Sequence, residues 1–360
     1  MRTVAEFSIK YQQILDPAGD LVGPLPAFAA DSAELIRMYR MMTFARLMDA
    51  KAVNLQRTGK LGTYASCLGH EATHVGVGAA MRPEDVLAPV YREYGAQMWR
   101  GVKMREILLY WGGDERGNDF AGPRQDFAWC VPIATQTAHA AGAAMAFKLR
   151  GEKRVAVGFV GDGGTSEGAF YEALNIAGVR ALPVVFIIVN NGYAISLPLA
   201  GQTAATTLAQ KGIAAQVPGI QVDGNDVLAV RQVVADALDS ARGGGGPALI
   251  EAITYRLGDH TTSDDASRYR SADEVAQAWL AEPLVRLRKY LTRQGAWSPA
   301  DEQALQQEGS ALVEAEVALY LSTPKQSTDT MFDYLFAQTP RHLALQRAVA
   351  RRHPTNDGGH

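Results

Sequence analysis

The stretches VAVGFVGDG (residues 155–163) and VVFIIVNN (residues 184–191) share one plan: each is an apolar run rich in β-branched residues that ends in small polar ones. Apolar runs of this length are typical of strands buried on both faces. An amphipathic stretch of helical length, residues 166–179, separates them. The segment therefore predicts a strand–helix–strand unit, and with it an α/β fold in which helices flank a parallel sheet.

The polar ends of both strands are predicted to meet at one edge of the sheet, where open α/β sheets bind ligands. Asp162 offers a carboxylate and Asn191 a neutral carboxamide, and both are oxygen ligands suited to Mg²⁺. Gly163 and Gly164 would let the backbone approach a diphosphate, and a helix starting near Ser166 would point its N-terminus at that anion. The alternative is two turns without a ligand, since Gly-Asp-Gly and Asn-Asn form turns readily.

The bulk composition excludes several classes of protein. The chain has 360 residues, 47% of them hydrophobic, and a net charge of −3, so no basic footprint for nucleic acid or for an anionic membrane is present. No apolar run reaches the about 18 residues of a membrane span. The start, Met1-Arg2-Thr3, lacks the apolar core of a signal peptide, so we expect a cytoplasmic protein. With only Cys67 and Cys130, neither a disulfide framework nor a cysteine metal site is expected.

The chain divides into four expected parts. Residues 1–30 are predicted to be an irregular arm rich in Pro and Gly, residues 31–270 the α/β domain, residues 271–345 a helical extension, and residues 346–360 a disordered tail. The periodicity of the α/β domain predicts helices at 32–57, 70–81, 94–110, 135–149 and 226–242, and further strands at 86–90, 220–222 and 249–255.

The two motifs also carry a specific resemblance. Gly161 to Gly168, taken with Asn190 to Ser196, resembles the thiamine diphosphate-binding motif in the alpha subunit of the heterotetrameric 2-oxo acid dehydrogenases. These proteins are the first components of the pyruvate and branched-chain complexes. The resemblance extends from about residue 8 to about residue 340, with further matches at 59–62, 91–93, 132–136, 222–226 and 255–270. It implies the thiamine diphosphate-binding fold, with thiamine diphosphate and Mg²⁺ as cofactors.

The resemblance implies roles for residues on both sides of the motif. The side chains of Asp162 and Asn191 and the carbonyl of Tyr193 would bind Mg²⁺. Tyr91 and Arg92, which follow a predicted strand, would bind the diphosphate, and Arg supplies a charged bidentate donor; the alternative is a surface pair. The diphosphate would also lie along the glycines of the motif, Gly161, Gly163 and Gly164.

Ile133 and His260 match two further positions of the family. The side chain of Ile133 would lie beneath the thiazolium ring and hold the cofactor bent; the alternative is a core isoleucine. His260, in a polar stretch, matches the active-site histidine near the diphosphate and the reacting carbon; the alternative is a solvated loop histidine. His70, His74 and His139 are expected to be structural.

Half of the expected active site is absent from the sequence. Enzymes of this class need a second α/β domain whose glutamate activates the aminopyrimidine ring of the cofactor. The residues before Gly161 predict helices and a loop instead of that domain, and Glu71 is interpreted as a helix residue. The resemblance therefore implies a separate beta subunit that supplies the glutamate, in a heterotetramer of two alpha and two beta subunits.

The leading expectation is an alpha subunit that, with its beta subunit, decarboxylates pyruvate oxidatively and transfers the acyl group to a lipoyl domain of the acyltransferase core. Gly161–Gly168 and Val217–Gly224 look like bacterial pyruvate-type subunits, whereas Thr262–Asp265 looks like branched-chain ones. The alternative substrate is therefore the branched-chain 2-oxo acid 3-methyl-2-oxobutanoate. An acetoin-cleaving relative, a stand-alone thiamine diphosphate lyase or transketolase-like half enzyme, and a non-catalytic cofactor-binding scaffold stay open.

Overall fold

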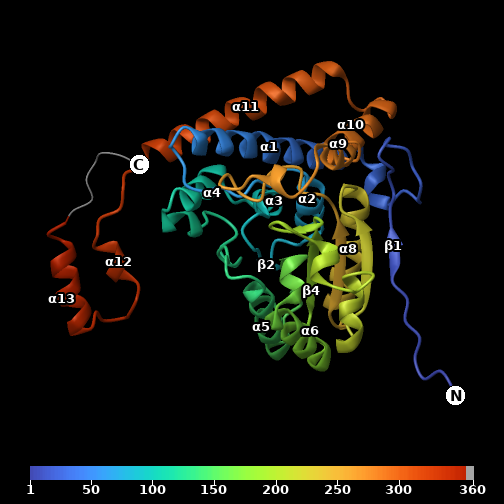
Figure 1. Cartoon of the computed structure of the whole chain (residues 1–360), viewed down its shortest axis with the longest axis horizontal. Coiled ribbons are helices and arrows are strands. Elements are labelled where there is room, and N and C mark those ends of the chain that lie inside the picture. The colour runs from blue at the N-terminus through green and yellow to red at the C-terminus, as the bar shows by residue number, and fades with distance from the viewer. Residues whose placement is uncertain (354–360) are drawn as a thin grey trace.

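The computed structural model, which describes residues 1–353, contains a six-stranded sheet with helices on both faces (Figure 1). The strand order is β1-β7-β8-β4-β3-β2, and every neighbouring pair is parallel. This arrangement confirms the predicted α/β class. The strands of the sheet are β1 (Lys10–Gln12), β2 (Val86–Ala88), β3 (Ala156–Gly161), β4 (Val184–Asn190), β7 (Gly219–Asp223) and β8 (Ala248–Ile253).

Strands β3 and β4 are the ones predicted from the two apolar runs. All of β4 is buried, and β3 is buried through Val160, as expected for strands covered on both faces. The register pairs Gly161 with Val189, so the two strands end at the same level. Asp162 and Asn191 therefore leave the sheet at one edge, as predicted.

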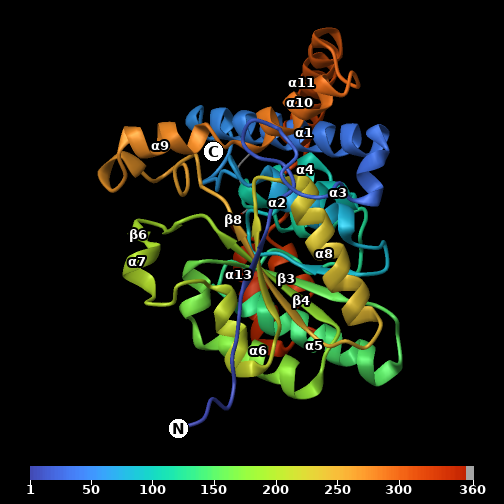
Figure 2. The ribbon, with the colours of Figure 1, turned by 90° about the vertical axis from the view of Figure 1, so that its right-hand side faces the viewer.

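Two helical layers cover the sheet (Figures 1 and 2). One layer contains α5 (Thr135–Arg150) and α6 (Gly168–Arg180), and the other contains α2 (Glu71–Ala80) and α8 (Val227–Arg242). Successive side chains of β3 point to opposite layers: Phe159 packs in the core with α2 and α8, whereas Val160 packs in the core with α5 and α6.

A third layer is built on the long helix α1 (Ser32–Arg57), which begins as predicted. The carboxylate of Asp31 caps it by accepting a hydrogen bond from the Ala33 amide at 2.9 Å. Helix α11 (Pro299–Ser322) packs against α1 (Figure 1). Glycine at position 309 lets the two helices approach closely, because a Cβ there would lie 2.5 Å from Leu47 Cδ1 and would force that side chain to shift.

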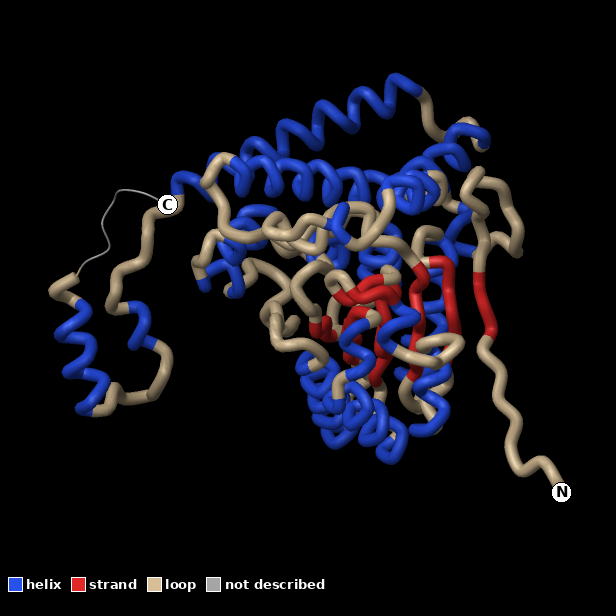
Figure 3. The backbone as a smooth tube through the Cα atoms, in the orientation of Figure 1, coloured by secondary structure: helices blue, strands red, loops and turns tan. Residues whose placement is uncertain are grey.

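The remaining elements are short, and Figure 3 shows that loops connect most of them. Within residues 1–353, no helix is both long enough and apolar enough to cross a bilayer. A small antiparallel hairpin pairs β5 (Tyr193–Ala194) with β6 (Leu197–Pro198). The other helices are α3 (Tyr94–Arg100), α4 (Met104–Trp111), α7 (Leu199–Gln202), α9 (Ala272–Trp279), α10 (Pro283–Arg293), α12 (Thr330–Asp333) and α13 (Arg341–Ala350), with 3₁₀ turns at Ala27–Ala30, Glu115–Asn118, Gly163–Ser166, Ala209–Ala215 and Ala266–Arg268.

The N-terminal arm is not irregular throughout, which corrects the prediction for residues 1–30. Its strand β1 extends the sheet by pairing with β7. The carboxylate of Asp226 fixes this strand, because it accepts hydrogen bonds from the amides of Ile14 and Leu15, both at 2.7 Å. These partners are more than 200 residues away in sequence, so the local pattern of the arm does not reveal the strand.

Two further boundaries differ from the prediction. Residues 94–110 form two helices instead of one, because Gly101 ends α3 in the left-handed conformation with φ 112°. The tail predicted to be disordered from residue 346 begins inside α13, where Arg347 forms an ion pair with Asp329 at 2.8 Å. The predicted tail beyond residue 353 lies outside the described residues.

Candidate active site

A cavity of about 620 Å³ lies at the edge of the sheet where β3 and β4 end. All of the site residues predicted from the sequence line this one cavity. They come from the ends of strands, from loops, and from the hairpin β5–β6, and they are Tyr91, Arg92, Ile133, Gly161, Asp162, Gly163, Gly164, Asn191, Tyr193 and His260. The structure thus brings together segments that lie up to 169 residues apart, from Tyr91 to His260, about half of the chain.

One end of the cavity presents oxygen ligands. Asp162 directly follows β3 and is only 2% exposed, and within residues 1–353 it forms no ion pair. Burial raises the pKa of its carboxyl, against the hydrogen bond that Gln202 Nε2 donates to Oδ2 at 2.8 Å. Asn191 accepts a hydrogen bond from the Tyr193 amide at 3.2 Å. A buried carboxylate without a cationic partner fits a bound divalent cation.

The coordination that such a cation would find here is typical of Mg²⁺. Among residues 1–353, no group of three or more His, Cys, Asp or Glu side chains is arranged to hold a metal ion. A cation at Asp162 would therefore take its other ligands from Asn191, from backbone carbonyls, from phosphate oxygens and from water. Mg²⁺ usually binds through one or two carboxylates together with substrate phosphates and water.

The turn after Asp162 is shaped for close approach. A Cβ at position 163 would lie 2.6 Å from Ala194 Cβ, and one at position 164 would lie 2.6 Å from Val160 Cγ2, so only glycine fits at either position. The helix predicted to start near Ser166 is preceded by the 3₁₀ turn Gly163–Ser166, and α6 itself begins at Gly168. The glycine turn, and not the first turn of α6, therefore carries the backbone along the cavity.

The other end of the cavity carries positive charge. Arg92 and Arg256 are 5% and 1% exposed, and neither forms an ion pair within the described residues. Arg92 donates to the carbonyls of Ser66 and His260, and Arg256 donates to the carbonyl of Ile195 at 2.7 Å. Two buried cations without a carboxylate partner fit a bound polyanion such as a diphosphate.

His260 lies between these two guanidinium groups. Its Nδ1 is 3.2 Å from Arg92 Nη2 and 3.4 Å from Arg256 Nη1. Burial, and then the charges of Arg92 and Arg256, lower the pKa of His260 to about 3, so the ring is neutral at pH 7. Because Nδ1 faces two N–H donors it acts as the acceptor, which assigns the single ring proton to Nε2.

Tyr91 and Ile133 complete the predicted set. The Tyr91 ring meets the His260 ring edge-on, with centroids 6.3 Å apart. Ile133 is 44% exposed and lies beside the glycine turn. A Cβ added at Gly164 would lie 3.1 Å from Ile133 Cγ2. The alternative of a core isoleucine is therefore wrong, since the side chain is open to the cavity.

Three residues at or behind the cavity were not predicted from the sequence. Arg256 lines the cavity, Gln202 orients Asp162, and Lys211 donates from behind the glycine turn to the carbonyl and hydroxyl of Thr165, both at 2.9 Å. Burial lowers the pKa of Lys211. Gln202 and Lys211 are isolated polar residues outside any motif, so the sequence offers no signal for them. For Arg256 the available signal was the match of residues 255–270 to the family.

Glu71 is a helix residue, as predicted, at the start of α2, whereas His70, which was expected to be structural, lines the active-site cavity. Both Glu71 oxygens are used, one by Arg46 Nε at 2.9 Å and one by the Gly69 amide at 2.9 Å. His70 and His74 are one helical turn apart, with ring centroids 5.5 Å apart, and their nitrogens are buried without partners in the described part of the chain. The spacing His70-Glu71-x-x-His74 is that of a zinc-binding helix, but here the glutamate is engaged and no third ligand is present among residues 1–353.

The fold and the site define an α/β protein with one cavity, in which one end carries the Asp162 carboxylate and the other carries the guanidinium groups of Arg92 and Arg256. These are called the cation-binding end and the anion-binding end, after the ligands that their charges fit. Comparison with known proteins then gives the family: the chain belongs to the Dehydrogenase E1 component family, whose sequence model matches residues 39–328. This is a thiamine diphosphate-dependent enzyme family of 2-oxo acid dehydrogenases. The resemblance expected from the sequence is therefore confirmed.

Two curated relatives show how wide the likeness is. The chain is 39% identical over 338 residues to the pyruvate dehydrogenase E1 component subunit alpha of Staphylococcus aureus. The aligned region covers 94% of this chain and 91% of that protein. The chain is also 44% identical over 315 residues to the 3-methyl-2-oxobutanoate dehydrogenase subunit alpha of Mycobacterium tuberculosis. Here the aligned region covers 87% of this chain and 86% of that protein. The two relatives differ in the substrate that their names give.

Proposed function

We propose that this chain is the alpha subunit of a 2-oxo acid dehydrogenase that binds Mg²⁺ and thiamine diphosphate in the cavity described above. Residues 31–270 would form its cofactor domain and residues 271–345 a helical extension. The observation that carries the proposal is the charge of the cavity: the buried carboxylate of Asp162 at one end and the buried guanidinium groups of Arg92 and Arg256 at the other all lack ion-pair partners among the described residues. A magnesium diphosphate supplies both missing charges.

Asp162, Asn191 and the carbonyl of Tyr193 would hold Mg²⁺, while Tyr91, Arg92 and Arg256 would bind the diphosphate along the glycine turn. When bound, thiamine diphosphate supplies the electron sink for decarboxylation of a 2-oxo acid. Ile133, exposed to the cavity, would support the thiazolium ring from below.

His260 would act as a neutral hydrogen-bond donor near the diphosphate and the reacting carbon. Its Nδ1 faces Arg92 and Arg256, so the Nε2 proton is the one available to a ligand. The low pKa keeps the ring neutral, so it does not add a third positive charge to the cavity. The catalytic role of His260 would thus be to donate one hydrogen bond from its Nε2–H group in a fixed direction.

We propose a beta subunit as the partner, in a heterotetramer of two alpha and two beta subunits, and a lipoyl acyltransferase core as the acceptor of the acyl group. The support is twofold. First, residues 1–353 contain one domain with a parallel sheet, while this class of enzyme needs two such domains. Second, the cavity wall carries exposed apolar residues: Val131, Ile133 and Ile195 are 51%, 44% and 54% exposed. Apolar surface of this kind at a polar cavity marks a contact with another molecule.

The substrate proposed first is pyruvate, with 3-methyl-2-oxobutanoate as the second candidate. The relative from Staphylococcus aureus favours the first and the relative from Mycobacterium tuberculosis favours the second. The decisive side chains of the acyl pocket are expected to include those of the beta subunit. A cytoplasmic location stays a prediction, which cell fractionation would test.

The test is co-expression with the beta chain, followed by assay of both 2-oxo acids with Mg²⁺ and thiamine diphosphate. We expect the alpha chain alone to be inactive and the heterotetramer to decarboxylate one of the two acids with a kcat/KM at least tenfold higher. Turnover by the alpha chain alone would favour the stand-alone lyase or transketolase-like half enzyme. Turnover of acetoin and of neither acid would favour the acetoin-cleaving relative.

A further inference from the structure

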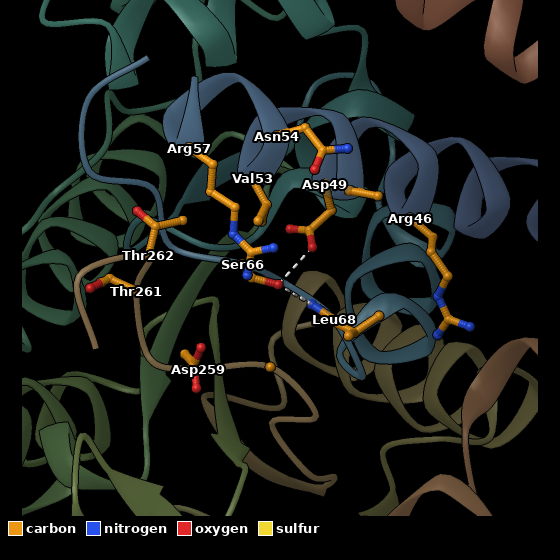
Figure 4. Close-up of a pocket in the computed structure, with 12 residues that line it drawn as sticks. Arg46, Asp49, Val53, Asn54, Arg57, Ser66, Leu68, Asp259, Thr261 and Thr262 are labelled. Atoms are coloured by element: carbon orange, nitrogen blue, oxygen red, sulfur yellow. Dashed lines mark hydrogen bonds between the residues drawn. The ribbon is translucent and has the colours of Figure 1, made fainter. Parts of the chain in front are cut away.

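A buried carboxylate outside the cavity, that of Asp49 on α1, holds a neighbouring segment by three hydrogen bonds. Asp49 is 3% exposed and forms no ion pair within residues 1–353. Its Oδ1 accepts from the Tyr64 hydroxyl at 2.9 Å and from the Cys67 amide at 2.7 Å, and its Oδ2 accepts from the Ser66 hydroxyl at 2.6 Å. Figure 4 shows Asp49 reaching from α1 to Ser66. Burial of a charge is costly, so this arrangement calls for an explanation beyond packing.

The segment that Asp49 holds is residues 63–69, here called the strap. The strap lies between the active-site cavity and a second cavity of about 360 Å³ beneath α1, and Thr261 lines both cavities. Its backbone pairs with the loop that carries His260: the Thr262 amide donates to the Tyr64 carbonyl at 2.8 Å, and the Leu257 amide donates to the Leu68 carbonyl at 3.1 Å. The His260 loop is thus fixed to the strap on both sides of the histidine.

The strap also holds one of the arginines of the anion-binding end. The Ser66 carbonyl accepts a hydrogen bond from Arg92 Nη1, while Arg92 Nη2 donates to the His260 carbonyl at 2.9 Å. The Ser66 side chain is held by Asp49 on the opposite side of the strap. A continuous chain of contacts therefore runs from Asp49 through Ser66 to Arg92 and His260.

We propose that Asp49 is a positioning residue for the anion-binding end: it fixes the strap at the place where Ser66 holds Arg92 against His260. The inference rests on the proposed function, since the ligand that Arg92 and His260 would receive is the diphosphate. All three groups that face Asp49 donate to it, and the carboxylate accepts these hydrogen bonds with two oxygens. An asparagine would offer one acceptor oxygen and would turn an N–H group toward the second position, where a hydroxyl would have to rotate to accept it.

The experiment compares wild-type heterotetramer with the Asp49→Asn variant, using inorganic pyrophosphate with Mg²⁺ and thiamine diphosphate with Mg²⁺ as probes. We expect the Kd of both probes to rise about 10- to 100-fold, the size typical when a group that orients a ligand-binding residue is lost.

Asp85→Asn is the matched control. Asp85 is a fully buried carboxylate at the opposite edge of the sheet, where it accepts from the Val155 amide at 3.0 Å and pairs with Arg242 at 2.9 Å. This variant should lower Tm without changing either Kd. If Asp49→Asn lowered Tm and left the Kd for pyrophosphate unchanged, as the control does, the proposal would be overturned.

A milder variant keeps the proposal testable if Asp49→Asn does not fold. Ser66→Ala removes one of the three bonds to Asp49 and retains the carbonyl that Arg92 uses. We expect a rise in Kd of about three- to tenfold for one lost hydrogen bond, and an unchanged Kd would contradict the role of Asp49. If wild-type heterotetramer bound neither probe, the proposed function itself would fail together with this inference.

Discussion

The two ends of the cavity are built in different ways. At the cation-binding end, Asp162 and Asn191 each follow a central strand, and the parallel register alone brings them together. At the anion-binding end, Arg92, Arg256 and His260 lie in irregular segments that are held by hydrogen bonds between loops. The first end depends on the sheet and the second on side chains, so substitutions at the two ends should have different consequences.

The largest effect is expected at the cation-binding end, from Asp162→Ala. This variant removes the carboxylate that would hold Mg²⁺, and activity of the heterotetramer should fall about a thousandfold or more, because the charge of a metal ion is worth several kcal/mol. Calorimetry should also show loss of the rise in Tm that Mg²⁺ with thiamine diphosphate gives wild type.

The Tm without cofactor should not fall in Asp162→Ala, because a buried carboxylate without an ion pair contributes little stability. That measurement separates loss of the site from loss of the fold. Full activity of the reconstituted complex would instead favour the non-catalytic scaffold.

The next largest effect is expected at the anion-binding end, from Arg256→Gln. A charge-assisted hydrogen bond contributes about 1.5–3 kcal/mol, so the Kd for thiamine diphosphate should rise about 10- to 100-fold. Titration calorimetry measures this change, with Arg268→Gln, an exposed arginine near the same loop, as the control that should leave the Kd unchanged. An unchanged Kd in Arg256→Gln would show that this guanidinium does not meet the anion.

The same variant should change the pH dependence of the anion-binding end. Arg256 is one of the charges that lower the pKa of His260 to about 3, so its removal should raise that pKa toward 6.5, as NMR titration would show. A histidine with a lowered pKa destabilises the folded state as pH falls from about 6.5 toward 3, because the unfolded chain takes up the proton first. Arg256→Gln should therefore lose less stability over this range than wild type, and an equal loss would contradict the assignment.

A smaller effect is expected from Gln202→Leu, which tests whether the cation-binding end depends on side chains as well as on the sheet. Gln202 Nε2 donates to Asp162 Oδ2 at 2.8 Å, and loss of a partner that orients a metal ligand typically costs 10- to 100-fold in metal affinity. Here we expect about tenfold weaker Mg²⁺ binding at saturating thiamine diphosphate. Gln210→Leu serves as the control. The Gln210 amide oxygen accepts a hydrogen bond from the Thr207 amide and does not contact Asp162, so this variant should bind Mg²⁺ as wild type does.

The smallest effect is expected from Glu167→Gln. Glu167 is an exposed carboxylate on the cavity wall, and the proposal assigns activation of the cofactor to a glutamate of the beta subunit. Exchange of the thiazolium C2 proton with deuterium, followed by NMR in the heterotetramer, should stay within about threefold of wild type. A hundredfold slower exchange would place the activating carboxylate in this chain.

The contrast between the two ends also explains what the sequence could reveal. The meeting of Asp162 and Asn191 at one edge was predicted from the sequence pattern alone, since strand exits follow from periodicity and the parallel sheet brings them to one edge. Tyr91, Arg92, Ile133 and His260 were predicted only through the family resemblance, because no local pattern distinguishes them from surface or core residues. The geometry now places them at the cavity, while their roles stay predictions.

What the sequence did not reveal depends on contacts between distant segments. Arg256 is an isolated charge after β8, and its burial follows from the hydrogen bonds it makes with the hairpin β5–β6 region. Gln202 reaches Asp162 only because that hairpin folds back over the glycine turn. Strand β1 has three residues and gains its place from pairing with β7 and from the contacts of Asp226.

The most direct test of a magnesium diphosphate site is calorimetric titration of the heterotetramer with thiamine diphosphate, first with Mg²⁺ present and then with EDTA. Uncompensated charge at both ends of one cavity predicts one thiamine diphosphate bound per alpha chain and loss of that binding when the cation is removed. Binding of equal affinity in EDTA, or no binding at all, would contradict the claim that the cavity is completed by a magnesium diphosphate.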